Sequence, residues 1–278
     1  MSLIALGKAK SWGTTTAVMA LANVWPSDRR LLVAECDPAG GDLAPRYGLA
    51  LEPGLMSLAA AARRGLSAST VAANTQRLPG GLAVLVAPPA ADQARAALSA
   101  IAGRLADAMR TEVDQDVLAD CGRLDPGSPA QDLARSAALT VVVARATLEE
   151  TAHVLARVSG LRAVGAEVVV VLVEDEPRLG GQRPYRPEEV AEAVDAEVVG
   201  TLAHDPRGAA LLAGRTANAR ALQRCALIRS ARLIAAELVA RVARPAHEIE
   251  SSVPAWGMIS TSSAPPEAVP ARPLRARS

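Results

Sequence analysis

Short, continuous apolar runs alternate along the chain with longer alanine-rich stretches of helical character. The short runs predict strands at Leu3–Leu6, Leu31–Glu35, Leu82–Val86, Asp116–Asp120, Thr140–Ala144, Glu167–Val173 and Val198–Leu202. The longer stretches predict helices at Thr15–Val24, Gly54–Arg64, Ala90–Met109, Pro129–Ala137, Leu148–Leu161, Pro187–Val194 and Asn218–Val242. Residues 141–144 and 168–173 are almost entirely apolar, which is typical of parallel strands covered on both faces.

This alternation of strand and helix predicts an α/β fold with a doubly wound, mostly parallel sheet and helices on both faces. In such sheets, ligands bind beyond the carboxyl ends of the strands. The polar residues that follow each predicted strand are therefore the first candidates for a functional site.

The last predicted helix carries an apolar stripe made of Leu227, Ala231, Ile234, Leu238 and Val242. Arg229, Arg232 and Arg244 lie away from it. In one interpretation the helix docks on the sheet and its basic face is only solvated. In the other, the basic face binds DNA or anionic lipid.

After residue 243 the composition changes to Pro, Ser, Ala and Glu, with no apolar period through Ser278. The expected organisation is a folded domain at 1–243 and a disordered tail at 244–278. Residues 174–187 are polar and rich in turn formers, which predicts an exposed loop. This loop and the tail are the expected places for partner contacts.

The composition narrows the class of protein. Half of the 278 residues are hydrophobic, yet no apolar run reaches the roughly 18 residues that a membrane-spanning helix needs. The first residues are apolar before they are basic, the reverse of a secretory signal. Three scattered cysteines suit neither a disulfide framework nor a zinc cluster, and a net charge of +1 argues against a nucleic-acid coat protein. A cytoplasmic globular protein is expected.

Only two of the 30 basic residues are lysines, and both, Lys8 and Lys10, follow the first predicted strand. The segment that leads into the first predicted helix includes Gly13 and the hydroxyl groups of Thr14, Thr15 and Thr16. Backbone amides at a helix N-terminus suit a phosphate, and a hydroxyl in the first turn can reach magnesium. A plain turn capped by threonine has the same pattern, and an arginine-biased sequence can leave two lysines together by chance.

Two further predicted strands end in acidic residues. Glu35 and Asp37 precede a Pro-Ala-Gly-Gly turn, and Asp120 is followed by Cys121 and Gly122. Carboxylates in these places can hold a magnesium-bound water or orient an attacking one. Alternatively, Asp37 only starts an Asx turn and Glu35 is only solvated. Three such segments, each at a strand's carboxyl end, are expected to converge on one crevice.

In this order, the three segments resemble the MinD/ParA family of deviant-Walker P-loop ATPases, and most closely its CpaE/TadZ branch, which places pilus and secretion machinery. The segment from Asp37 to Ala44, with the Leu-x-Leu-x-Pro-Gly-Leu that ends at Leu55, is similar to that branch. The family's first loop reads K-G-G-x-G-K-T-T. Residues 199–205, ending in Asp205, resemble the late strand that lines the adenine pocket.

The resemblance implies a site for ATP and Mg2+. Lys10 matches the signature lysine that reaches across a nucleotide-sandwich dimer, with Lys8 as the alternative. Asp37 is implied to orient water, and Asp120 with Gly122 to form the Walker B and switch region. Residues implied to act on the metal are Thr15, Glu35, Asp37 and Asp120, and residues implied to bind nucleotide are Lys8, Lys10, Gly13, Thr14, Thr15, Thr16, Gly122 and Asp205.

The departures from the family pattern shape the expected function. The second Walker lysine is absent, with Thr14 or Thr15 in its place, and Glu35 replaces an aspartate. Loss of a phosphate-clamping charge slows phosphoryl transfer by orders of magnitude, so little or no hydrolysis is expected. The resemblance then favours a homodimeric positioning or scaffold protein that recruits a secretion or pilus motor ATPase, at a pole or a membrane-associated complex. The alternatives are an active ParA-type partition ATPase that binds DNA, and a structural relic whose Trp12 covers an empty site.

Overall fold

The computed structural model describes residues 2–10, 13–26, 28, 30–111, 115–174, 184–214 and 219–243. The strands are β1 (Leu3–Lys8), β2 (Arg30–Glu35), β3 (Gln76–Arg77), β4 (Ala83–Leu85), β5 (Gln115–Arg123), β6 (Leu139–Arg145), β7 (Val168–Val173) and β8 (Val198–Leu202). The first helices are α1 (Thr14–Asn23), α2 (Leu43–Tyr47), α3 (Leu55–Ala61), α4 (Ala68–Ala73), α5 (Ala91–Arg110) and α6 (Gln131–Ser136). They are followed by α7 (Leu148–Ala163), α8 (Pro187–Val194), α9 (Pro206–Leu212), α10 (Ala219–Arg224) and α11 (Ala226–Ala243).

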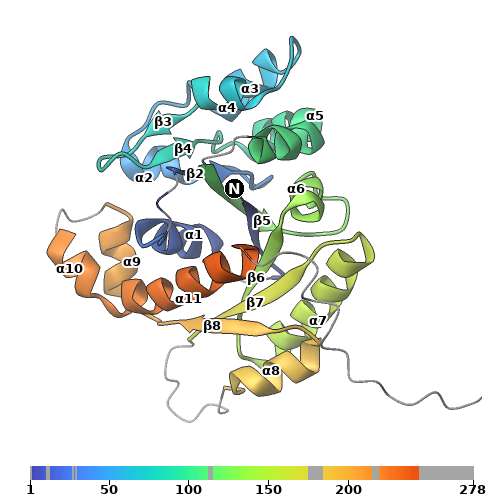
Figure 1. The fold of residues 1–278 in the computed structure, drawn as a ribbon, viewed down its shortest axis with the longest axis vertical. Helices are drawn as coiled ribbons and strands as arrows, with labels where there is room; N and C mark the ends of the chain where they lie inside the picture. The colour runs from blue at the N-terminus through green and yellow to red at the C-terminus, as the bar shows by residue number, and fades with distance from the viewer. Residues whose placement is uncertain are drawn as a thin grey trace, which may run out of the picture. The chain divides into compact units, whose positions relative to one another are not determined.

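The strands form one sheet in the order β3-β4-β2-β5-β1-β6-β7-β8. Every neighbouring pair is parallel except β3 and β4, which form an antiparallel hairpin at one edge. Figure 1 shows α1 and α11 on one face of this sheet and α5 to α8 on the other. The predicted α/β fold with a doubly wound, mostly parallel sheet is confirmed.

The core divides into two layers because successive side chains of a strand point to opposite faces. Leu3 and Ala5 of β1 pack with α3, α5, α6 and α7, whereas Ile4 and Leu6 pack with α1 and α11. With no Phe in the chain, both layers are built mainly from Ala, Val and Leu. The sheet is thereby covered on both sides, and its carboxyl edge is left to carry polar groups.

Several predicted boundaries are wrong in ways that bear on the site. β1 continues to Lys8 and β5 to Arg123, because the two strands stay paired beyond Leu6 and Asp120 through an irregularity in register. Asp120 therefore lies inside β5 rather than at its end. Short α2, α4 and α9 were not predicted, nor was β3, since five to seven residues, or two, carry too little periodicity.

The C-terminal helical region is two helices, α10 and α11, rather than one. In α11, Leu227, Ala231, Ile234 and Leu238 of the predicted stripe are buried and Val242 is partly buried, while Arg229 and Arg232 are exposed. The predicted start at Asn218, most of the 174–187 loop, Arg244 and the 244–278 tail lie outside the described residues, so the domain prediction stays a prediction. No helix within the described ranges is long and apolar enough to cross a membrane.

Candidate functional site

The candidate site lies where β1, β2 and β5 end side by side. β5 is the shared neighbour of β1 and β2, and Asp120 pairs in register with both Leu6 and Glu35. This arrangement brings together four side chains from separate segments, which we call the strand-end cluster: Lys8, Thr15, Asp37 and Asp120. The predicted convergence of the three sequence segments therefore holds for these four residues.

Asp120 is the buried centre of the cluster, with 2% of its surface exposed. Its side chain accepts hydrogen bonds from the Thr15 hydroxyl and from the Gly122 amide, the latter at 3.1 Å. Burial raises its pKa from 3.8 to about 6, against these two hydrogen bonds; Asp37 adds to the rise and Lys8 opposes it. A cation bound beside Asp120 would favour the ionised form of this carboxyl group.

Asp37 packs directly against Gly122. A Cβ atom at Gly122 would lie 1.9 Å from the Asp37 carboxyl carbon, and Gly122 has φ +56. Only glycine leaves room here for the carboxylate to approach the β5 backbone. Asp37 Oδ1 also accepts from the Ala39 amide at 2.8 Å, the Asx turn considered from the sequence. Burial raises the pKa of Asp37, while the Ala39 hydrogen bond and the Lys8 ammonium oppose the rise.

The two lysines occupy different environments. Lys8 is the last residue of β1 and is partly buried, close enough to Asp37 and Asp120 for its ammonium to lower the pKa of both carboxyls. Lys10 lies in the following loop and is exposed. Of the two candidates for the signature lysine, Lys8 is engaged within the cluster and Lys10 is accessible from outside.

The turn into α1 is built around Gly13, which caps the helix with φ +109 and has open space where a Cβ atom would stand. Thr14 follows as the first helical residue; it is 2% exposed, and its hydroxyl has no hydrogen-bond partner in the described part of the chain. Thr15 hydrogen-bonds to Asp120, whereas Thr16 is partly buried in the first turn. A buried hydroxyl without a partner at a helix N-terminus fits a phosphate-bearing ligand. Trp12 lies outside the described residues.

Glu35 is engaged by backbone amides, although it lies close enough to Asp120 for that carboxylate to add to the rise in its pKa. Its Oε1 accepts from the amides of Asp42 and Leu43, at 2.6 and 2.8 Å, and its Oε2 accepts from the Ala87 amide at 2.9 Å. Burial raises its pKa to about 7 even though these three amides favour the ionised form. Glu35 thereby ties the turn after β2 to the segment after β4. This geometry favours a structural role over the expected contact with a metal.

Asp205 likewise serves the backbone. Its Oδ1 accepts from the Gly208 amide at 2.8 Å, which caps α9, and its Oδ2 accepts from the Leu227 amide at 3.3 Å in α11. Desolvation raises its pKa, but the backbone hydrogen bonds outweigh that effect and the net pKa is lowered. The side chain thereby joins the N-terminal ends of two helices, and its expected place at the adenine pocket stays a prediction.

No group of three or more His, Cys, Asp and Glu side chains in the described ranges is arranged to hold a metal ion by itself. Magnesium in nucleotide sites is held by one or two carboxylates together with phosphate oxygens and water. Asp120 and Thr15, with Asp37 beside them, fit this pattern, so a magnesium ion here would arrive with a phosphate-bearing ligand.

Sequence reasoning missed Arg95 of α5. Its charge opposes the rise that burial causes in the pKa of Asp37, so it lies near the cluster, although nothing in the sequence around the first loop points to it. Only the packing of α5 against the sheet brings this guanidinium to the carboxyl edge. The hydrophobic period of α5 predicts the helix but not this contact.

The sequence matches no protein-family model and no curated protein sequence. Solved structures do share its fold, at low sequence identity. A ParA-family ATPase from Chlorobium tepidum matches 85% of this chain and 97% of its own, with a TM-score of 0.63 and 14% identity. The septum site-determining protein MinD from Pyrococcus horikoshii, complexed with Mg-ADP, matches 85% of this chain and 95% of its own, with a TM-score of 0.64 and 15% identity.

The MinC:MinD cell division complex from Aquifex aeolicus contains a further match. It covers 86% of this chain and 96% of that chain, with a TM-score of 0.65 and 12% identity. All three sequence identities are too low to transfer an activity to this chain, but the three structures agree with it in architecture. The chain therefore has the P-loop α/β fold of the MinD/ParA ATPases.

Proposed function

We propose that this chain is a MinD/ParA-like positioning protein that binds Mg·ATP at the strand-end cluster and recruits or localises a protein machine. The observation that carries the proposal is the meeting of Asp37, Asp120 and Thr15 beside Lys8, under a glycine turn that leads into α1. The same edge of the sheet carries ligands in doubly wound folds. Solved structures with this fold include a Mg-ADP complex of MinD.

Each residue of the site has a proposed role. Asp120 and Thr15 hold the magnesium ion, and Asp37, fixed against Gly122, orients the attacking water. The amides that follow Gly13 and the hydroxyls of Thr14 and Thr16 face the phosphates. Lys8 balances the two carboxylates, and exposed Lys10 acts across a homodimer.

Hydrolysis is proposed to be slow or absent. Thr14 or Thr15 stands where the second Walker lysine is expected, and a hydroxyl cannot supply the point charge that a lysine places on the β- and γ-phosphates. Arg95, near Asp37, is a cation from another segment, but it is exposed and its own placement depends on α5. The site is thus better suited to binding nucleotide than to turning it over.

The proposed partner is a protein of the secretion or pilus motor class, in line with the CpaE/TadZ resemblance of residues 37–55. A precedent for partner binding on this fold is the complex of MinC with MinD. The proposed place of action is the cytoplasm, at a pole or a membrane-associated complex.

The second candidate is a partition ATPase that binds DNA through α11. The exposure of Arg229 and Arg232 supports it. Arg241, on the same helix, counts against it, because its guanidinium is paired with Glu197 and lies 3.9 Å from Glu237. Within the described part of α11, two exposed arginines make a small electrostatic footprint for DNA.

Calorimetric titration with ATP and Mg2+ tests the nucleotide site. We expect saturable binding that Asp37→Asn and Lys10→Ala each weaken about tenfold or more. Asp132→Asn, an exposed acid on α6, is the matched control and should bind as the native chain does. Absence of heat at millimolar ATP, in a protein that is folded, would contradict the proposal and favour a ligand-free scaffold.

DNA binding separates the two candidates. A partition ATPase should bind non-specific DNA with nucleotide, in a salt-sensitive way that Arg229→Gln and Arg232→Gln weaken. A positioning protein should instead bind its protein partner whether or not ATP is hydrolysed. Nucleotide-dependent DNA binding at physiological salt would replace the first proposal with the second.

A further inference from the structure

A cavity of about 450 Å3 lies at the amino edge of the sheet, where β2 and β5 begin. Arg30 and Gln115, the first residues of these two strands, line it and pair in register. The ends of α1 and α4 and the β3–β4 hairpin complete its walls. Because the strands are parallel, the strand-end cluster lies at the other end of the same strands. The cavity is therefore separate from the proposed nucleotide site.

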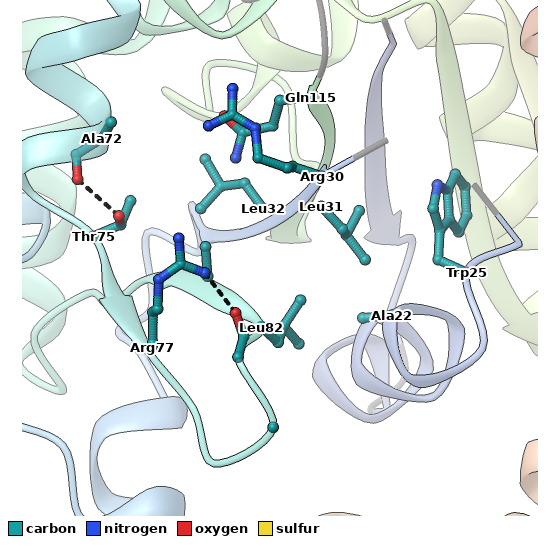
Figure 2. A pocket seen from close by; sticks show the side chains of 13 residues that line it. Ala22, Trp25, Arg30, Leu31, Leu32, Ala72, Thr75, Arg77, Leu82 and Gln115 are labelled. Atoms are coloured by element: carbon teal, nitrogen blue, oxygen red, sulfur yellow. Dashed lines mark hydrogen bonds between the residues drawn. The ribbon is translucent and has the colours of Figure 1, made fainter. Parts of the chain in front are cut away.

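One side of the cavity is basic. Arg77, on β3, and Arg30, on β2, both line it, and Figure 2 shows their side chains on the side where Leu32 and Thr75 lie. The Arg77 Nη1 donates to the Gly81 carbonyl at 2.7 Å, which holds its guanidinium at the hairpin. A guanidinium has five N–H donors, so this bond leaves others for a ligand. Among the described residues that line the cavity, none carries a carboxylate.

The other side is apolar and aromatic. Leu31, Leu82 and Trp25 line it and are only partly buried. The Trp25 indole is fixed, because its Nε1 donates to Asp116 Oδ2 at 3.1 Å while the Ser2 amide donates to Asp116 Oδ1 at 3.0 Å. Asp116 is buried, so this link to Ser2 anchors the indole to the start of the chain. The aromatic wall is thus in place without a ligand.

We propose that this cavity binds a small anionic molecule with a planar or apolar body. Arg77 takes its carboxylate, sulfonate or phosphate group, and Leu31, Leu82 and Trp25 take its body. Guanidinium groups favour such oxyanions because they offer paired donors and a fixed charge. The volume lies within the range of small-molecule sites, which are mostly apolar with a few placed polar groups.

Fluorescence titration of the full chain with 1-anilinonaphthalene-8-sulfonate tests the proposal. Its neutral counterpart, N-phenyl-1-naphthylamine, has the same aromatic body without the sulfonate. We expect saturable binding of one sulfonate probe per chain, and roughly tenfold weaker binding of the neutral probe, as for loss of a charge-assisted hydrogen bond.

Three variants locate the probe. Arg77→Gln should weaken binding of the sulfonate probe roughly tenfold and leave the neutral probe unchanged. Ala72→Glu, at an exposed position of α4 on the rim, should weaken it similarly by adding a negative charge. Arg135→Gln, an exposed arginine on α6, is the matched control and should have no effect.

Three results would overturn the proposal. Equal affinities for the two probes, or equal losses in Arg77→Gln and Arg135→Gln, would mean that the cavity does not recognise an anion. Displacement of the sulfonate probe by Mg·ATP, together with an unchanged probe affinity in Arg77→Gln, would place the probe in the nucleotide site instead. Since the two sites lie at opposite edges, failure of ATP binding in calorimetry would leave this test unaffected.

Discussion

The acidic side chains of the carboxyl edge fall into two groups with opposite surroundings. Glu35 and Asp205 each have one oxygen engaged by a backbone amide nearby in sequence and the other by an amide from another segment. Asp37 and Asp120 lie instead beside Lys8, with Thr15 bonded to Asp120. The first group holds turns and helix ends together, and the second is arranged to meet a cation. The role of an acidic side chain near a strand end is thus indicated by the groups that surround it and donate hydrogen bonds to it, and not by its position in the sequence.

Removal of Glu35 should have the largest effect on stability. Glu35→Ala leaves three amides without an acceptor, at roughly 1–3 kcal/mol each, so we expect a loss of about 4 kcal/mol in the free energy of unfolding. Urea unfolding measures it. Asp37→Asn, two residues away, should change stability by no more than about 1 kcal/mol, because asparagine keeps an oxygen for the Ala39 amide. Equal losses of unfolding free energy in the two variants would show that the two groups of acidic side chains do not differ in their contribution to stability.

A substitution at Gly122 tests how Asp37, in the second group, packs against β5. In Gly122→Ala the new Cβ meets the Asp37 carboxylate, and φ +56 is strained for alanine. We expect a loss of about 3 kcal/mol and displacement of Asp37. Gly127→Ala is the matched control, since Gly127 also has positive φ but nothing within 4 Å of its Cβ position, and should cost about 1 kcal/mol. If the two variants unfold at the same urea concentration, Asp37 does not pack as described.

The pKa of Asp120 predicts a pH dependence of stability. Its folded pKa is raised from 3.8 to about 6 by burial, so its contribution is fully present below about pH 4 and is lost as pH rises through about 6. The rise corresponds to at most about 3 kcal/mol. Asp120→Asn should remove this part of the pH dependence, and saturating Mg·ATP should reduce it in the native chain. Identical pH profiles for the native chain and Asp120→Asn, followed by thermal unfolding, would show that Asp120 does not titrate there.

Asp205 should show the opposite sign and the smallest effect. Its folded pKa is lowered, so its stabilisation is present above 3.8 and is lost as pH falls through the folded pKa. Asp205→Ala should cost about 1 kcal/mol at pH 7, as for loss of an N-cap, with the difference shrinking in acid. Chemical unfolding at several pH values measures it. A difference that grows on acidification would contradict the capping role.

The strand pattern predicted most of the fold because buried parallel strands are apolar in any context. The errors in the predicted strand and helix bounds lie where tertiary contacts determine the structure. β1 and β5 extend to Lys8 and Arg123 through pairing with each other, which no periodicity records. The last helix divides at Cys225, and Asp205 meets the first turn of α11 just beyond, from across the fold.

The location of the candidate site could be predicted from the sequence, but the roles of its individual residues could not. Glu35 and Asp37 look alike in sequence, and Glu35 is distinguished by the Asp42 and Leu43 amides of the following turn and by the Ala87 amide after β4. Arg95 and the basic side of the amino-edge cavity were not anticipated, because they depend on the packing of α5 and on the β3–β4 hairpin. The paired glycines at Gly80 and Gly81 were the available signal for that hairpin.

Backbone hydrogen exchange with and without Mg·ATP tests the central claim, that nucleotide binds at the strand-end cluster. The account predicts slower exchange at residues 13–16, 37–41 and 121–124 in millimolar Mg·ATP, with no change at residues 76–83 beside the amino-edge cavity. Asp37→Asn should reduce the slowing without unfolding the chain. Unchanged exchange at the carboxyl edge, or slowing confined to residues 76–83, would contradict the account.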